Sequence, residues 1–427
     1  MQGILDKCFY FMREIMIHKK LILIEIILLP FLMLNPSMLH AEKSYMYSSI
    51  PPLSMTKVSP DEVKGIHITS CVASNLELFK QSLALADRTE LNAVVIDIKE
   101  TDGVIAYRTA VPLAREIGAI KPIMDIEKIV KLCDQHQLYK IARICVFKDN
   151  LLAQAIPDMA VCEKNGQIWY DFKGACWTNP YCQDVWEYNL SLAKELIAYG
   201  FNEIQFDYVR FPTDGRISNC WYGKDHNNKT AIAATSDFVK FCKQGMGGKG
   251  YISVDVFGLS IDRDLGIGQD FMEIARYADF ISPMVYPSHY YRGEYGLINP
   301  DAMPYDVINI STKNALRKLE GTGCKLRSWL QDFSLKQQYG PVEVQLQIKA
   351  LLQRGCNSWL LWNPCCRYTE EALMPDDEGA KNDSFYTTPS TPEEELIRNE
   401  SLRIAGLSTV SSVMTERCSR DYDYWVE

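Results

Sequence analysis

Eight short runs rich in β-branched and aromatic residues recur along the middle of this 427-residue chain, separated by segments whose apolar residues have helical spacing. The β-rich runs cover residues 65–69, 93–99, 141–147, 203–210, 252–258, 280–287, 326–333 and 358–363. The helical patterns cover residues 76–87, 125–137, 184–199, 231–243, 269–278, 311–319 and 342–354. Strands joined by crossover helices pair in parallel, so this alternation constrains the fold more than any other feature of the sequence.

Eight strands with helices between them predict a (β/α)8 TIM barrel, an α/β fold in which the sheet closes on itself. An open doubly wound sheet is the alternative, but it usually has fewer strands and often a glycine-rich phosphate turn after a strand. The glycine-rich segment 245–250 instead ends a helix, which indicates a helix stop. We therefore expect one barrel domain over residues 64–373, with a linker at 42–63 and an acidic linker and tail at 374–427.

The N-terminal segment, residues 1–41, has the pattern of an export signal. Two lysines precede an apolar run at residues 21–34, and Ala41 stands where cleavage would fall. Glu25 within the run weakens this pattern and leaves an uncleaved membrane anchor as the alternative, with membrane association through this segment. In either case we expect the barrel to be exported to the periplasm, the cell envelope or the medium.

The formal net charge of −9 comes from the C-terminal part of the chain. Residues 1–368 hold 40 acidic and 40 basic side chains, whereas residues 369–427 hold 14 acidic and 5 basic ones. A charge-balanced barrel offers no basic surface of the kind that binds nucleic acid, so we expect no nucleic-acid partner.

The 14 cysteines show no C-x-x-C pair and no spacing to histidine that is typical of zinc ligands. We therefore expect neither a metal nor another cofactor. Cys162, Cys176, Cys182 and Cys220 fall in long segments between strands. In an exported protein we expect at least one disulfide among these four.

Acidic side chains stand near the ends of the central strands. Because side chains alternate along a strand, Asp97 shares one face with Lys99, and Asp207 shares one with Gln205. The apolar residues between them should face the helices, so the polar ones should point into the barrel. Asp207 and Asp255 then lie near the carboxyl ends of adjacent strands, where (β/α)8 barrels build their sites.

Carboxylates, amides and aromatic rings at one mouth suit a sugar, whose C–H faces stack on rings and whose hydroxyls bind polar groups. Cleavage of a glycosidic bond needs one protonated and one ionised carboxyl group, for which we select Asp207 and Asp255. Metal hydrolysis would need clustered histidines, but His67 stands near the bottom of the first strand, away from the others. The substrate-binding candidates are Asp97, Lys99, Glu100, Gln205, Arg210, Tyr286, His289, Trp329, Gln331 and Trp362.

Several motifs together make residues 64–373 resemble a family of bacterial barrel proteins classed as glycoside hydrolases and distantly similar to α-amylase-type barrels. The motifs lie at residues 98–103, 143–149, 203–212, 255–258, 267–269, 282–290, 299–305 and 329–333. The resemblance implies a (β/α)8 fold and a carbohydrate substrate. In amylase-type barrels the nucleophile is an aspartate ending the fourth strand and the acid a glutamate ending the fifth. Asp207 matches the first, and Asp255 replaces the glutamate.

We therefore predict an exported glycoside hydrolase with Asp207 as nucleophile or stabilising carboxylate and Asp255 as proton donor. Arg210 or Gln205 would keep Asp207 ionised. The alternative is a non-catalytic glycan-binding envelope protein, in which Asp207 pairs with Arg210 and Asp97 with Lys99 for structural reasons. A cytoplasmic barrel for a phosphorylated substrate would show a glycine-rich loop after strand seven or eight, and none is present.

Overall fold

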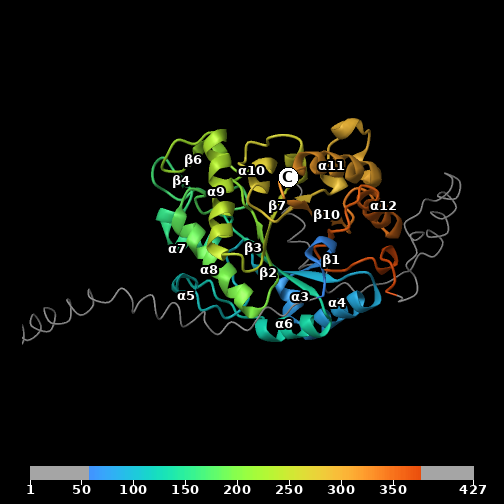
Figure 1. The fold of residues 1–427 in the computed structure, drawn as a ribbon. Helices are drawn as coiled ribbons and strands as arrows, with labels where there is room; N and C mark the ends of the chain where they lie inside the picture. Colours follow the sequence, from blue (N-terminus) through green and yellow to red (C-terminus); the bar gives the residue numbers. More distant parts are fainter. Residues whose placement is uncertain (1–56, 377–427) are drawn as a thin grey trace, which may run out of the picture. The chain divides into compact units, whose positions relative to one another are not determined.

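The computed structural model describes residues 57–376 of the chain (Figure 1). The predicted signal or anchor at 1–41, the linker up to residue 56 and the tail from residue 377 lie outside the described residues. Within the described part, no helix combines the length and the apolar composition that a membrane crossing requires.

Eight parallel strand positions close into a barrel, which confirms the predicted (β/α)8 architecture. They are β1 (Lys64–Ile68), β2 (Ala93–Lys99), β3 (Tyr139–Cys145), β5 (Glu203–Asp207), β7 (Tyr251–Phe257), β8 (Phe280–Met284), the pair β9 (Lys325–Leu326) and β10 (Ser328–Gln331), and β11 (Trp359–Trp362). The barrel closes because β11 pairs with both β1 and β10, while β10 reaches β8 through Trp329 and Met284. The seventh strand position is interrupted at Arg327.

Helices surround these strands (Figure 1). They are α3 (Ser70–Ser74), α4 (Leu76–Arg88), α5 (Pro112–Glu116), α6 (Ile126–Gln135), α7 (Asn150–Ala155), α8 (Gln183–Tyr199), α9 (Asn228–Met246), α10 (Phe271–Ala275), α11 (Pro304–Leu319) and α12 (Pro341–Leu352). The glycine-rich segment ends α9 as predicted, with Gly247 in the left-handed conformation at φ 58°. The predicted start of α11 at residue 311 is wrong, because Pro304 sets the first turn seven residues earlier.

Strand parity separates two apolar cores. Val94, Ile96 and Ile98 of β2 pack in the layer between the sheet and the helices. Ala93 and Val95, on the opposite face, join Trp329 and other side chains in the barrel interior. The polar side chains predicted to point inward therefore share the barrel interior with a small apolar cluster.

The segments that follow β3 and β5 are long, and they are joined to each other. Within them, β4 (Cys162–Glu163) pairs antiparallel with β6 (Cys220–Trp221). Figure 1 shows this small sheet beside α7 and α9. The two loops therefore form one substructure over the neighbouring ends of β3 and β5.

The predicted disulfide is absent, because Cys162, Cys176, Cys182 and Cys220 are all free thiols in the structure. Cys176 is buried, and its Sγ lies 3.1 Å from Asn150 Oδ1 instead of facing another sulfur. Cys162 and Cys220 lie on the paired strands β4 and β6, where the β-ladder already joins the two loops.

Candidate active site

A single arginine, Arg143 of β3, lies among the carboxylates in the upper part of the barrel. Its Nη1 donates to Asp97 Oδ1 at 2.6 Å, and its Nε and Nη2 donate to Asp207 Oδ2 at 3.2 and 2.5 Å. Nε also lies 3.7 Å from Asp255 Oδ2. None of these four residues is more than 5% exposed. One guanidinium thus holds three carboxylates away from bulk water, where close ion pairs and hydrogen bonds must offset desolvation.

His67 supplies a second positive charge. Its Nε2 lies 2.8 Å from Asp97 Oδ2. Burial alone would lower the pKa of His67, but the charge of Asp97 and this hydrogen bond raise it to about 9. The Trp362 ring stacks on the imidazole at 3.9 Å between ring centres. Our expectation that His67 lies near the bottom of its strand is wrong, because β1 ends only one residue later at Ile68.

Asp97 balances these two cations. Burial would raise the pKa of its carboxyl, but the charges of His67 and Arg143 lower it to about 2. Asp97 therefore stays ionised and is the anchor of the network, with each of its oxygens on a different cation.

Asp207 is the last residue of β5 and is held from two sides. Besides Arg143, the backbone N–H of Tyr208 donates to its Oδ1 at 2.5 Å. Tyr208 adopts a left-handed φ of 54°, a strained conformation for a residue with a side chain. We expected Arg210 or Gln205 to hold Asp207, but Arg143 does so. Gln205 lies lower on the same strand, fully buried, with its Nε2 3.4 Å from Ser282 Oγ.

Asp255 has a different environment from Asp207. Its Oδ1 accepts a hydrogen bond of 2.7 Å from the neutral indole Nε1 of Trp329, and its contact with Arg143 is only the 3.7 Å approach. Burial, together with the charge of Asp207, raises the pKa of Asp255 well above the usual aspartate range. Tyr286 lies beside both acids, and burial and their charges raise the pKa of its phenol as well. The environment of Asp255 therefore favours its protonated form.

Glu100 directly follows β2 and accepts a hydrogen bond from Ser70 Oγ. Burial and the nearby charge of Asp97 raise the pKa of Glu100 to about 7. It is only partly buried, so it lies between the interior network and the surface.

Lys99 does not join the site. The ladder between β2 and β3 shifts register between Asp97 and Lys99, and this bulge turns the lysine to the outer face of the barrel. There its Nζ lies 2.7 Å from Asp149 Oδ2 and 2.9 Å from Asn189 Oδ1. The predicted sharing of one face by Asp97 and Lys99, and their predicted ion pair, are therefore wrong.

Arg210 lies on the loop after β5 and contacts rings instead of a carboxylate. Its guanidinium carbon is 5.0 Å from the centre of Trp177, 4.9 Å from Tyr208 and 4.8 Å from Phe257. Nη1 donates to the Phe211 carbonyl at 3.2 Å. Arg210 is therefore held in an aromatic cage next to Asp207.

The remaining predicted residues divide between the interior and the loops. Trp329 and Trp362 contact each other at right angles in the interior. Gln331 is fully buried, and its Oε1 accepts two hydrogen bonds from Ser288, so it fixes the loop after β8. His289 of that loop packs against Tyr286 with ring centres 5.4 Å apart.

Sequence reasoning missed the two cations of the network, Arg143 and His67. The parity rule that selected Asp97 would have found both, since each lies between apolar residues on its strand and at the inward parity. Ser70 carried no such signal, because it is the first residue of α3 and lies outside β1.

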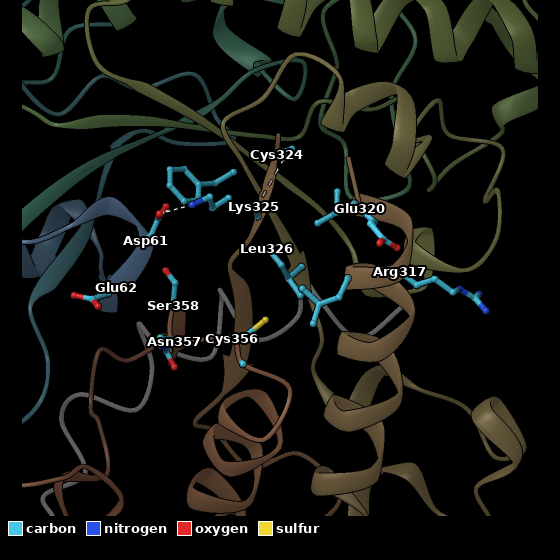
Figure 2. A pocket seen from close by; sticks show the side chains of 14 residues that line it. Asp61, Glu62, Arg317, Glu320, Cys324, Lys325, Leu326, Cys356, Asn357 and Ser358 are labelled. Carbon is cyan, nitrogen blue, oxygen red and sulfur yellow. Dashed lines mark hydrogen bonds and ion pairs between the residues drawn. The ribbon is translucent and has the colours of Figure 1, made fainter. Parts of the chain in front are cut away.

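A separate pocket of about 670 Å³ lies at the opposite end of the barrel, near the starts of the strands. Figure 2 shows Asp61 and Glu62 on one side, Arg317 of α11 and Glu320 just after this helix on the other, and Lys325 paired with Asp61. (β/α)8 enzymes carry out chemistry at the carboxyl ends of the strands, so this pocket is not the candidate active site. Across residues 57–376, no group of three histidine, cysteine, aspartate or glutamate side chains is arranged to hold a metal ion.

Comparison with known proteins gives one family match. The family model DUF4015, "Putative glycosyl hydrolase domain", matches residues 65–368. No curated protein matches the chain.

Solved structures with similar folds include three of note. A hypothetical protein from Ruminiclostridium thermocellum is 34% identical, with a TM-score of 0.41, over 45% of this chain and 97% of that one. The PgaB (BpsB) glycoside hydrolase domain from Bordetella bronchiseptica is 11% identical, with a TM-score of 0.52, over 71% of this chain and 94% of that one. The α-galactosidase TtGalA from Thermus thermophilus is 13% identical, with a TM-score of 0.47, over 81% of this chain and 62% of that one. The Bordetella domain supports the fold assignment.

Proposed function

The chain belongs to the DUF4015 family of putative glycosyl hydrolase domains, and we propose that it hydrolyses glycosidic bonds with Asp207 and Asp255 as its two catalytic carboxyl groups. Asp207 acts as nucleophile or stabilising carboxylate, and Asp255 acts as proton donor. The substrate is a poly- or oligosaccharide, and the pattern of residues 1–41 supports action outside the cytoplasm.

The observation that carries this proposal is the charge count of the buried network. Two cations, Arg143 and His67, face three carboxyl groups, Asp97, Asp207 and Asp255. One carboxyl group is therefore in excess, and in a buried site the excess is removed by binding a proton. Asp255 takes that proton, because its closest partner is a neutral indole.

A glycosidase needs this asymmetry. One carboxyl group must be protonated to assist the leaving oxygen, and the other must be ionised to attack or to stabilise the developing positive charge. The guanidinium of Arg143 orients Asp207 through two donors, and Trp329 orients the acid. Pairs of carboxyl groups whose environments push their protonation apart are the usual signature of acid and base roles.

Exposed aromatic side chains on the same face support a glycan of several units. Tyr170, Phe172, Trp221 and Tyr291 are 47%, 71%, 42% and 72% exposed. All four lie on the long loops that follow β3, β5 and β8. Isolated apolar rings in water are candidates for stacking on sugar faces, so a chain of sugars can extend over these loops.

The test is a screen of the full chain against a glycan library, followed by Asp207→Asn and Asp255→Asn on any substrate found. Removal of either carboxyl group should lower kcat by about 10³-fold or more, and the thermal midpoint of each variant shows whether it is folded at the assay temperature. Asp125→Asn is a matched control, because the Asp125 side chain caps α6 by accepting from the Lys128 N–H and asparagine caps equally well. Near-full activity in both site variants would show that the assignment is wrong.

A glycan-binding protein without catalysis is the second candidate. The ion pair between Arg143 and Asp207 favours it, because a carboxylate fully engaged by an arginine also serves structure. The same screen separates the two: binding of a glycan without release of reducing ends, in wild type and both variants alike, supports binding alone.

A further inference from the structure

Arg210 is the one cation beside the proposed catalytic residues that forms no ion pair with a carboxylate within residues 57–376, and the charge of Asp207 acts on it only from beyond ion-pair distance. Its hydrogen bonds go to the Phe211 carbonyl and to Thr213 Oγ1, both at 3.2 Å, and it forms no ion pair there. Asp207, three residues earlier, has one oxygen on Arg143 and the other on the Tyr208 N–H. Arg210 is 8% exposed, so water does not replace the missing anion fully.

The cage around Arg210 fixes the orientation of its guanidinium. Phe257 stands two residues after Asp255 and packs against the interior cluster that contains Tyr286 and Trp362. On the loop side, the indole Nε1 of Trp177 lies 3.4 Å from Asp171 Oδ2. Loop and barrel thus contribute one wall each, and because Nη1 is engaged by Phe211 and Thr213, the Nε and Nη2 edge is the one left for planar recognition.

A second cation increases the positive charge at this point. Lys148, which follows β3, lies over two of the rings that surround Arg210. Its Nζ is 5.5 Å from the ring centre of Trp177 and 5.7 Å from that of Tyr208. Its Nζ is 3.7 Å from Asp171 Oδ2. Burial lowers the pKa of Lys148, and the charge of Arg210 adds to this effect. Lys148 is paired with Asp171, and Arg210 adds a second positive charge to the cage.

An unmatched buried cation is costly unless a ligand supplies the counter-charge. A neutral sugar hydroxyl would satisfy the hydrogen bonds of Arg210 but not its charge. A carboxylate or phosphate group satisfies both, because its two oxygens match the two parallel N–H groups of a guanidinium.

We propose that Arg210 is the specificity residue for an anionic sugar, one that carries a carboxylate or phosphate group and binds next to Asp207. This inference rests on the proposed function, since it places the anionic unit beside the glycosidic bond to be cleaved. Arg210 binds the anion through its free edge, the aromatic cage holds the guanidinium plane, and Lys148 adds attraction.

Binding of small sugars to the full chain tests this independently of hydrolysis. The probes are D-glucuronate, D-galacturonate and glucose 6-phosphate, with D-glucose and D-galactose as neutral counterparts, measured by ligand-detected NMR at low ionic strength. The carboxylate and phosphate arms identify which anion is preferred. We expect at least one anionic sugar to bind about 10-fold or more tightly than its neutral counterpart, and added salt to weaken it.

The variants are Arg210→Met, which keeps an unbranched apolar side chain, and Arg210→Lys, which keeps the positive charge but loses the paired N–H groups of the guanidinium. Arg210→Met should weaken the anionic sugar roughly 10- to 100-fold and leave the neutral sugar unchanged, with Arg210→Lys between. Arg292→Met, at an exposed arginine on the loop after β8, is the matched control and should change neither. Thermal midpoints confirm that each variant is folded.

The inference is overturned if neutral and anionic sugars bind equally to wild type, or if Arg210→Met weakens both equally. Its failure is distinguishable from that of the proposed function. Hydrolysis of neutral glycans that needs Asp207 but not Arg210 would refute only the anionic subsite. Arg210-dependent binding of anionic sugars by a chain that cleaves nothing would refute only the hydrolase.

Discussion

Replacement of His67 by glutamine should lower the stability of the protein by an amount that depends on pH, in a direction fixed by the interior network. The pKa of His67 rises from its ordinary 6.5 to about 9 in the folded chain. A group whose pKa is raised by folding stabilises the protein fully below its unfolded pKa and loses that contribution as pH rises through the folded pKa. The contribution of His67 is therefore present at pH 6 and nearly gone above pH 9.

The size of the effect follows from the same two values. The interval between 6.5 and about 9, at about 1.4 kcal/mol for each pH unit, corresponds to about 3 kcal/mol. Glutamine has a similar shape, and its amide can still donate to Asp97, so the charge is the main loss. His67→Gln should thus lower the free energy of unfolding by about 3 kcal/mol more at pH 6 than at pH 9.5.

Urea unfolding of wild type and His67→Gln at pH 6, 7.5 and 9.5, with thiols kept reduced, measures this difference. His136→Gln is the matched control, because His136 pairs with Asp87 at the protein surface, where the two side chains are 27% and 46% exposed. Solvent screens such a pair, so its difference should stay below about 1 kcal/mol at every pH. A gap between wild type and His67→Gln that is constant from pH 6 to pH 9.5 would refute the buried imidazolium.

Two further predictions concern stability. Glu100→Gln should raise the free energy of unfolding by about 1–2 kcal/mol at pH 8 and by little at pH 4.5. The pKa of Glu100 is raised by folding from 4.5 to about 7, so the wild type loses stability as pH rises through this interval and the variant does not; urea midpoints at both pH values check this. Arg327→Met should lower the free energy of unfolding by about 3–5 kcal/mol, because Glu203, whose carboxylate lies 2.7 Å from the guanidinium, stays buried without a counter-charge. The control Arg317→Met, at an exposed position near the end of α11, should change the free energy of unfolding by less than about 0.5 kcal/mol.

The sequence predicted the barrel well because the spacing of apolar residues and the order of strand and helix patterns indicate this fold. The run at 93–99 matches β2 at both ends, and the patterns at 76–87 and 184–199 match α4 and α8 to within one residue. Strand ends were less accurate. The run predicted at 203–210 ends at Asp207, because Tyr208 turns into the left-handed region and leaves the ladder.

Parity also brought most of the acids to the correct face, since Asp97, Asp207 and Asp255 all meet Arg143. Their partners could not be predicted, because pairing across a barrel depends on stagger between strands that are far apart in sequence. Trp329, for example, donates to Asp255 from a strand 74 residues away. Loop contacts such as the cage of Arg210 depend on how two long segments fold together, and no periodicity encodes that.

The bulge in β2 accounts for the excess of carboxyl groups over cations in the buried network. Without it, strict alternation would turn Lys99 into the barrel on the same face as Asp97. A third buried cation would then balance the charge of the third carboxylate, and the protonated form of Asp255 would no longer be favoured. The bulge sends Lys99 to Asp149 on the outer face instead. One extra residue in one strand therefore leaves the interior short of a positive charge, and that shortage is the basis on which we propose Asp255 as the acid.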